Sequence, residues 1–122
     1  VYWYDFMNDN WPSYEREFNF GLVRYATDSK GKYTPKPAYV AYAVMARQLT
    51  GYTCTDMTIP ADDSGVYKAI FSNGEKTKMV LWSLTDNEVR LDKEYKITDI
   101  MGEETMGTSV HTDIYPQYCE LM

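Results

Sequence analysis

The first 51 residues combine aromatic-rich segments with polar turns and end in a segment of helical period. Residues 1–6 are an aromatic run with β propensity and no helical period, so we expect a short strand there. Residues 7–17 have the composition of an ordered loop, and residues 18–26 return to β-type side chains. Residues 28–32 are typical of a turn.

One α-helix is predicted over residues 37–49. Pro35 and Pro37 suit a helix entrance, where a missing N–H costs little, and Gly51 suits the position just after the helix. Arg47 lies in the closing turns, where a cation is favoured. Apolar side chains recur at three- or four-residue spacing on one face: Ala38, Ala41, Val44, Met45 and Leu49.

After Gly51 the hydrophobic period changes to two, which is typical of strands. The predicted strands are 66–73, 78–84, 88–91, 94–101, 108–112 and 113–121. The dipeptide Asn73-Gly74 favours a hairpin turn between the first two of them. Short strands at spacings of about ten residues predict a mainly β fold, a small antiparallel β-sandwich of five to seven strands. The aromatic strand, the loop and the helix precede it.

Composition divides the chain at the same place. Of the 19 aromatic residues, twelve lie in residues 1–50 and seven in the remaining 72. Residues 1–50 hold five acids and six bases, whereas residues 51–122 hold thirteen acids and six bases. We therefore expect two regions, residues 1–51 and residues 52–122.

The overall charge and hydropathy exclude two classes of function. The net charge of -6 argues against nucleic acid as a partner, because binding to the phosphate backbone needs clustered Lys and Arg. No apolar run approaches the roughly 20 residues that a membrane span requires, so no membrane partner is expected.

The sequence contains no motif for binding a metal or a cofactor. His111 is the single histidine, and no Cys or His stands at metal-ligand spacing around it, so we expect a surface strand residue. The acidic clusters 62–63 and 103–104 lack the spacing of a calcium loop and are expected in solvated turns. There is no glycine-rich phosphate loop, and we expect neither a metal nor a cofactor.

The two cysteines are Cys54, just after the helix, and Cys119, in the last strand. If the first and last segments of the sandwich pair with each other, a Cys54–Cys119 disulfide is feasible, and it would contribute about 4 kcal/mol in the chain-entropy model. Free thiols are the alternative, and two cysteines alone do not identify a redox compartment.

The order of several short motifs resembles a known group of enzymes. The motifs, in order along the chain, are YWYDFMNDNW, ERE, NFGL and KPAYVAYAVMARQLTGY. They are followed by a β region that contains VLWSL, ITDIMG and IYPQYCEL. This order resembles the carboxy-terminal end of a clan A glycoside hydrolase, in which a (β/α)8 barrel is often followed by a β-sandwich. The resemblance implies that residues 1–6 are the eighth barrel strand, that the aromatic loop lies at the active-site rim, and that residues 37–49 are the eighth helix.

The same resemblance implies that this chain carries no catalytic pair. Enzymes of this clan place their two catalytic carboxylates at the ends of the fourth and seventh barrel strands, which would lie upstream of Val1. Glycoside hydrolysis needs both carboxyl groups across the scissile bond. Glu15 and Glu17 match the loop before NFGL and are expected to be solvated or paired with Arg16 and Arg24. We therefore expect a non-catalytic accessory part of a secreted, extracellular enzyme that degrades β-linked plant polysaccharide.

Carbohydrate contact is expected near the amino-terminal end. The resemblance implies that Trp3 forms an aromatic platform beneath the sugar, since apolar sugar faces stack on indole; packing between strand and helix is the alternative. Further polar and aromatic candidates of the rim are Asp5, Asn8, Asp9, Trp11 and Tyr14. Asn and Asp also occur in loops for turn chemistry alone.

Two alternatives belong to other classes of function. A self-sufficient carbohydrate-binding module for β-glucan or xylan would place at least three aromatic rings in one exposed plane. Candidates for that plane include Trp3, Trp11, Tyr14, Tyr67, Tyr95, Tyr115 and Tyr118. A structural interaction domain would instead self-associate through the first strand, whose N–H and C=O groups would be unpaired.

Overall fold

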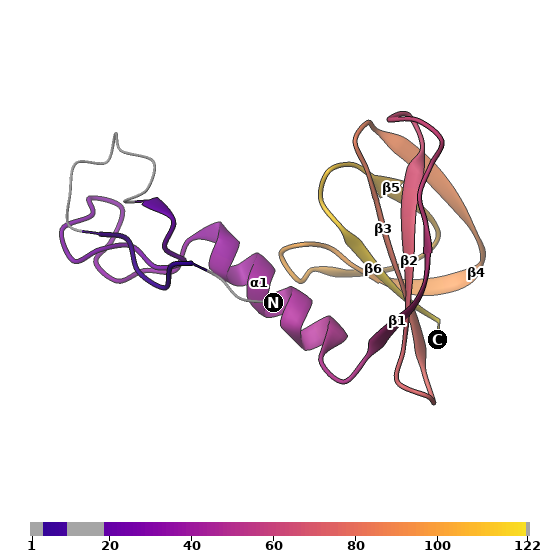
Figure 1. The fold of residues 1–122 in the computed structure, drawn as a ribbon, viewed down its shortest axis with the longest axis horizontal. Helices are drawn as coiled ribbons and strands as arrows, with labels where there is room; N and C mark the ends of the chain where they lie inside the picture. Colours follow the sequence, from indigo (N-terminus) through magenta and orange to yellow (C-terminus); the bar gives the residue numbers. More distant parts are fainter. Residues whose placement is uncertain (1–3, 10–18, 122) are drawn as a thin grey trace. The chain divides into compact units, whose positions relative to one another are not determined.

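The computed structural model describes residues 4–9 and 19–121 (Figure 1). The described residues form one helix and six strands: α1 Pro37–Leu49, β1 Thr53–Thr58, β2 Val66–Ser72, β3 Thr77–Ser83, β4 Asn87–Thr98, β5 Glu104–Thr112 and β6 Gln117–Leu121. All strand pairs are antiparallel, and the sheet order is β1-β2-β3-β6-β4-β5. The predicted mainly β, sandwich-like fold with a single helix is confirmed.

Contacts divide the chain into two compact units, Val1–Ala43 and Val44–Met122. The division falls inside α1, so the last two turns of the helix belong with the sheet. In the second unit, the buried Gln48 side chain donates a hydrogen bond to Thr98 Oγ1 in β4.

Helix α1 begins and ends where the sequence predicts. Gly51 has φ +83°, the left-handed conformation that commonly follows a helix, and the Tyr52 N–H closes the end by donating to the Leu49 carbonyl. Within the second unit, Val44 and Gln48 are the buried helical residues. No described helix is long and apolar enough to cross a membrane.

The β2–β3 hairpin confirms the turn predicted at Asn73-Gly74. Gly74 has φ +92°, and the Asn73 side-chain oxygen accepts hydrogen bonds from the N–H groups of Glu75 and Lys76. The seven residue pairs from Val66–Ser83 to Ser72–Thr77 are in regular register.

The sheet curls around one apolar cluster. Strand β4 bends along its length (Figure 1), and its register with β5 shifts between Arg90 and Tyr95. The two strands predicted at 88–91 and 94–101 are therefore one bulged strand. The bend brings β5 toward β3, where the buried side chains of Ser83 and Thr112 are hydrogen-bonded at 2.9 Å. The enclosed cluster consists of Leu81, Ile97, Val110 and Cys119.

Strand β1 was not predicted as a strand. All six of its residues, Thr53–Thr58, are exposed, because β1 is an edge strand that pairs only with β2. Its sequence TCTDMT lacks the alternation of apolar and polar residues from which the other strands were predicted. The position of this strand is set by pairing with β2 rather than by burial.

Cys54 and Cys119 do not form the disulfide that the sequence left open; the alternative of free thiols holds. Both thiols are free; Cys54 is exposed in β1, and Cys119 is buried in β6. The condition for the disulfide was that the first and last segments of the sheet pair, whereas β2 and β3 lie between β1 and β6. Cys119 instead packs in the apolar cluster, where its side chain is fully buried.

The two thiols should differ in reactivity. Burial raises the pKa of Cys119 to about 11, so its thiol stays protonated and shielded at about pH 8, whereas Cys54 is accessible to solvent. We expect iodoacetamide to alkylate Cys54 in the folded protein and Cys119 only after unfolding. Mass spectrometry of tryptic peptides reads out both sites. Equal labelling of the two cysteines, or a mass that rises on reduction, would contradict the expected free and unequal thiols.

Candidate functional site

Two segments of the first unit run side by side and position its polar residues. The Leu22 N–H donates to the Asp5 carbonyl, the Val23 N–H to the Phe6 carbonyl, and the Asn8 N–H to the Val23 carbonyl. Within the described residues, however, residues 4–9 and 19–26 form only isolated bridges, Met7 with Val23 and Val23 with Pro35. The strands predicted at 1–6 and 18–26 are wrong for this described part, because the pairing does not continue along either segment.

Gly21 permits this close approach. A Cβ atom at Gly21 would lie 2.2 Å from the Asn8 nitrogen and 2.3 Å from the Met7 carbonyl carbon. Both of these atoms belong to the backbone and cannot move aside as a flexible side chain could. The glycine of the NFGL motif is therefore required by space between the two segments.

Lys36 joins both segments to the start of α1. Its Nζ donates to Asn8 Oδ1 at 2.6 Å and to the Asn19 carbonyl at 2.8 Å. Asn8 Nδ2 in turn donates to Asn19 Oδ1 at 3.3 Å, and Asn8 is buried. Because Asn8 and Asn19 flank residues 9–18, Lys36 fixes the two ends of that segment at one point.

Arg24 is held by neutral oxygens on the same side. Its Nη1 donates to Thr34 Oγ1 at 3.0 Å and to the Pro35 carbonyl at 2.9 Å. The pKa of Lys36 is lowered, first by burial and then by the nearby Arg24 charge, and Asp28 partly opposes this lowering. The two cations are thus close enough to act on one another.

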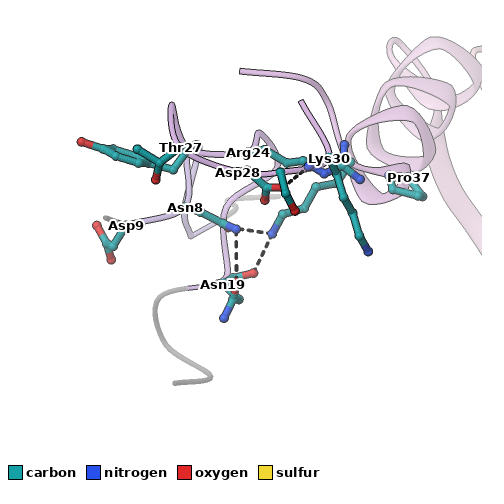
Figure 2. A pocket seen from close by; sticks show the side chains of 11 residues that line it. Asn8, Asp9, Asn19, Arg24, Thr27, Asp28, Lys30 and Pro37 are labelled. Atoms are coloured by element: carbon teal, nitrogen blue, oxygen red, sulfur yellow. Dashed lines mark hydrogen bonds between the residues drawn. The ribbon is translucent and has the colours of Figure 1, made fainter. Parts of the chain in front are cut away.

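These residues surround a polar pocket of about 590 Å³ (Figure 2). Its lining consists mainly of charged and amide side chains: Asn8, Asp9, Asn19, Arg24, Tyr25, Thr27, Asp28, Ser29, Lys30, Lys36 and Pro37. The Asp28 side chain also accepts the Lys30 N–H at 2.7 Å, which orders the turn predicted at 28–32. Hydroxyl-rich or charged small molecules suit a lining of this chemistry.

The pocket brings together some of the predicted carbohydrate-binding residues. Asn8 and Asp9 line it, and Asn8 also holds the fold through Lys36. Asp5 does not line it; the Asp5 side chain accepts the Phe6 N–H, so it shapes its own turn instead. Trp3, Trp11 and Tyr14 lie outside the described residues.

Sequence reasoning missed the basic side of the pocket. No role was predicted for Lys36, which lies between the two prolines of the predicted helix entrance, and Arg24 was only an expected partner of Glu15 or Glu17. Lys30 was part of a predicted turn. These residues lie 15 to 28 positions from Asn8 and Asp9 in the sequence, so no motif spacing connects them. The one signal in the sequence was the small number of acidic residues in residues 1–50 of a chain that is acidic as a whole.

Large apolar side chains are exposed elsewhere in the first unit. Exposure is 74% for Tyr4 and 61% for Phe6, and Phe20, Tyr33 and Tyr39 are also exposed. A smaller apolar hollow of about 360 Å³ is lined by Phe6, Met7, Val23, Tyr33, Pro35 and Tyr39. The first unit therefore leaves much of its aromatic surface uncovered by its own described residues.

The sheet aromatics do not form one exposed plane within the described part of the chain. Tyr118 is buried, Tyr95 packs against the apolar cluster, and Tyr115 is exposed. Tyr67 and Trp82 are half-buried and stacked with ring centroids 5.3 Å apart. Strand alternation places Trp82 on the face opposite the buried Leu81.

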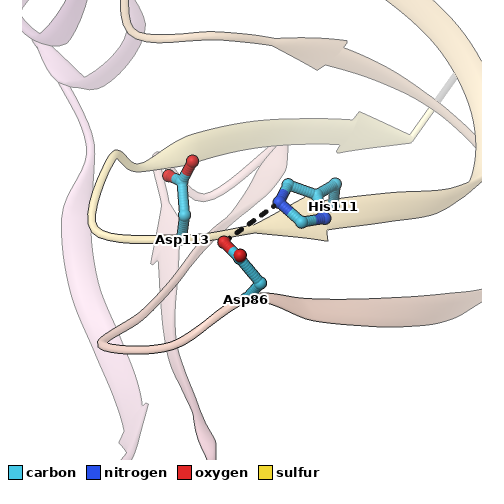
Figure 3. A group of neighbouring side chains, drawn as sticks. All are labelled: Asp86, His111 and Asp113. Atoms are coloured by element: carbon cyan, nitrogen blue, oxygen red, sulfur yellow. Dashed lines mark ion pairs between the residues drawn. The ribbon is translucent and has the colours of Figure 1, made fainter.

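His111 is a surface strand residue, as predicted, but it has acidic neighbours that spacing did not reveal. Donor atoms of Asp86, His111 and Asp113 lie within 4.8 Å of one another (Figure 3). Nε2 of His111 is 3.5 Å from the Asp86 carboxylate, and Nδ1 is 3.8 Å from Glu88. Among the described residues, Asp86, His111 and Asp113 have the donor atoms that could hold a divalent cation. Asp86 and His111 are exposed to solvent, and Asp113 is partly buried.

In comparisons with known proteins, no protein-family model, curated protein or solved structure matches the chain.

Proposed function

We propose that this chain is the non-catalytic, carboxy-terminal accessory part of an extracellular glycoside hydrolase that acts on β-linked plant polysaccharide. In this proposal the first unit completes the substrate rim of a catalytic barrel encoded upstream of Val1, and the sheet is the accompanying β-sandwich domain. Carbohydrate is contacted at the polar pocket and at the aromatic loop between Asn8 and Asn19.

The observation that carries the proposal is the Lys36 junction. Three motifs of the resemblance, NDN, NFGL and KPAY, supply the three residues that meet there, Asn8, Asn19 and Lys36. The junction fixes both ends of the predicted rim loop and lies beside a pocket lined by Asn8 and Asp9. Carboxylates and amides of this kind hydrogen-bond to sugar hydroxyls.

The exposed aromatic surface of the first unit supports a barrel partner. Clustered large apolar side chains on a folded surface commonly mark an interface. Tyr4, Phe6 and Tyr39 would be covered by the neighbouring strands and helices of the same barrel. The reading frame upstream of Val1 tests this part directly, because it should encode a barrel with glutamates ending its fourth and seventh strands. An unrelated sequence there would overturn the accessory role.

Carbohydrate contact is tested by titrating the chain with cellohexaose and with xylohexaose while backbone amide NMR shifts are recorded. We expect shifts at Asn8, Asp9 and Asn19 and in residues 10–18, and few in the sheet. Asp9→Asn should weaken binding about tenfold, since it replaces a charge-assisted acceptor in the pocket by a neutral one.

Asp63→Asn is the matched control, because Asp63 is an exposed carboxylate in the second unit. It should leave the affinity unchanged. Shifts confined to the sheet would favour the self-sufficient binding module, and no shift with either oligosaccharide would remove the support for carbohydrate contact.

A further inference from the structure

Positive charge collects in the polar pocket of an otherwise acidic protein. Arg24, Lys30 and Lys36 line the pocket together with two carboxylates, Asp9 and Asp28. The described lining residues therefore have one positive charge in excess, whereas the whole chain carries -6. Such a local reversal of sign favours a partner with negative charge.

The three cations are not neutralised by ion pairs among the residues that the structure describes. Among the described residues, the ion pairs with a nitrogen–oxygen distance within 4.0 Å all lie in the second unit. Arg24 and Lys36 are instead bound by neutral oxygens. Arg24 donates to Thr34 and Pro35. Lys36 donates to Asn8 and Asn19. Their side chains are thus fixed in position without a described carboxylate within ion-pair distance, and Asp28 acts on Lys36 only from farther away.

Both side chains retain donors for a ligand. A lysine ammonium has three N–H donors, and two of those of Lys36 are used. The guanidinium of Arg24 uses Nη1 for both of its hydrogen bonds, which leaves Nε and Nη2 for a further acceptor. A guanidinium edge with two parallel donors matches the two oxygens of a carboxylate.

We propose that the pocket binds the carboxylate of an acidic sugar, a uronic acid unit of the polysaccharide, through Arg24, Lys30 and Lys36. This inference rests on the proposed function and names the substrate class for it. A sugar carboxylate brings one negative charge, which matches the excess of one positive charge. Asp9 and Asp28 would accept hydrogen bonds from the neighbouring hydroxyl groups, and they disfavour more highly charged anions such as phosphate.

The experiment compares two ligands by isothermal titration calorimetry. One is a xylo-oligosaccharide with a single glucuronic acid branch, and the other is the same oligosaccharide without the branch. We expect the acidic ligand to bind about tenfold more tightly at about 20 mM salt and to lose most of this preference at about 500 mM, because salt screens the charges.

Variants locate the preference. Lys30→Gln changes an exposed pocket cation whose side chain holds no described contact, so folding should be retained while the preference falls; Arg24→Gln should reduce it further. Lys32→Gln is the matched control, since Lys32 is an exposed cation of the same unit outside the pocket lining. Circular dichroism checks that each variant is folded.

The outcomes separate the inference from the function beneath it. Equal affinity for both ligands, or a preference that survives both pocket variants, would overturn the acidic-sugar inference and leave carbohydrate binding standing. Binding of neither ligand would overturn both.

Discussion

Gly21→Ala is expected to disrupt the first unit while the sheet stays folded. The added methyl group would lie 2.2 Å and 2.3 Å from backbone atoms of Asn8 and Met7, and the Asn8 N–H is held in place by its hydrogen bond to the Val23 carbonyl. Relief requires the two segments to separate, which breaks the hydrogen bonds that Leu22 and Val23 donate. We expect a local loss of about 3 kcal/mol or more.

Amide hydrogen exchange measures this loss at the positions concerned. The N–H groups of Asn8, Leu22 and Val23 should exchange about 100-fold faster in the variant, with the amides of β3 and β6 unchanged. Gly107→Ala is the matched control, because a Cβ there meets Ser109 and Ile97 only at ordinary contact distances of 3.4 Å and 3.7 Å. Unchanged exchange at Leu22 and Val23 in Gly21→Ala would contradict the close approach of the two segments.

Local signals in the sequence predicted the elements that depend on neighbouring residues. The helix is bounded by Pro37 and followed by Gly51, and the hairpin turns at Gly74; the two glycines have positive φ. These features are set within a few residues of the chain. Pattern alone was therefore sufficient for the helix, the hairpin and the mainly β fold.

Features set by distant contacts were not predicted. Strand β1 lacks a buried face, and the bulge in β4 depends on how β5 folds back toward β3. The possible disulfide assumed a strand order that the sheet does not have. Strand order and bulges are decided by packing across the whole sheet, which the period of a single strand does not encode.

The candidate site shows the same limit in chemical terms. Asn8 and Asp9 were chosen because amides and carboxylates suit sugar hydroxyls, and both line the pocket. Lys36, 28 residues from Asn8, was not chosen, although its hydrogen bond to Asn8 is one of the contacts that form the site. A lysine next to a proline has no sequence feature that predicts hydrogen bonds between its side chain and residues far away in the chain.

A buried lysine, Lys78, organises the other unit. Lys78, Glu120, Lys96 and Glu104 alternate in charge across the adjacent strands β3, β6, β4 and β5, with nitrogen–oxygen separations of 3.7 to 3.9 Å. At one end of this row, Lys78 donates to both the backbone carbonyl and the side-chain oxygen of Gln48, each at 2.9 Å. Lys78 thus joins the carboxyl end of α1 to the sheet.

Lys78→Met is expected to lower the free energy of unfolding of the second unit by about 2 to 3 kcal/mol. Methionine keeps the apolar stem, but it leaves the buried oxygens of Gln48 without a donor and removes the ammonium 4.9 Å from the Tyr52 ring. Urea denaturation followed by circular dichroism measures the change.

Lys76→Met separates this helix contact from the general effect of removing a charge. Lys76 also pairs with Glu120, at 3.7 Å, but its side chain is 68% exposed, whereas that of Lys78 is 10% exposed. An exposed pair contributes about 0.5 kcal/mol or less, because water and salt screen it. A similar loss in both variants would mean that Lys78 acts only through Glu120. A large loss confined to Lys78→Met would instead assign the stabilisation to the hydrogen bonds at the end of the helix.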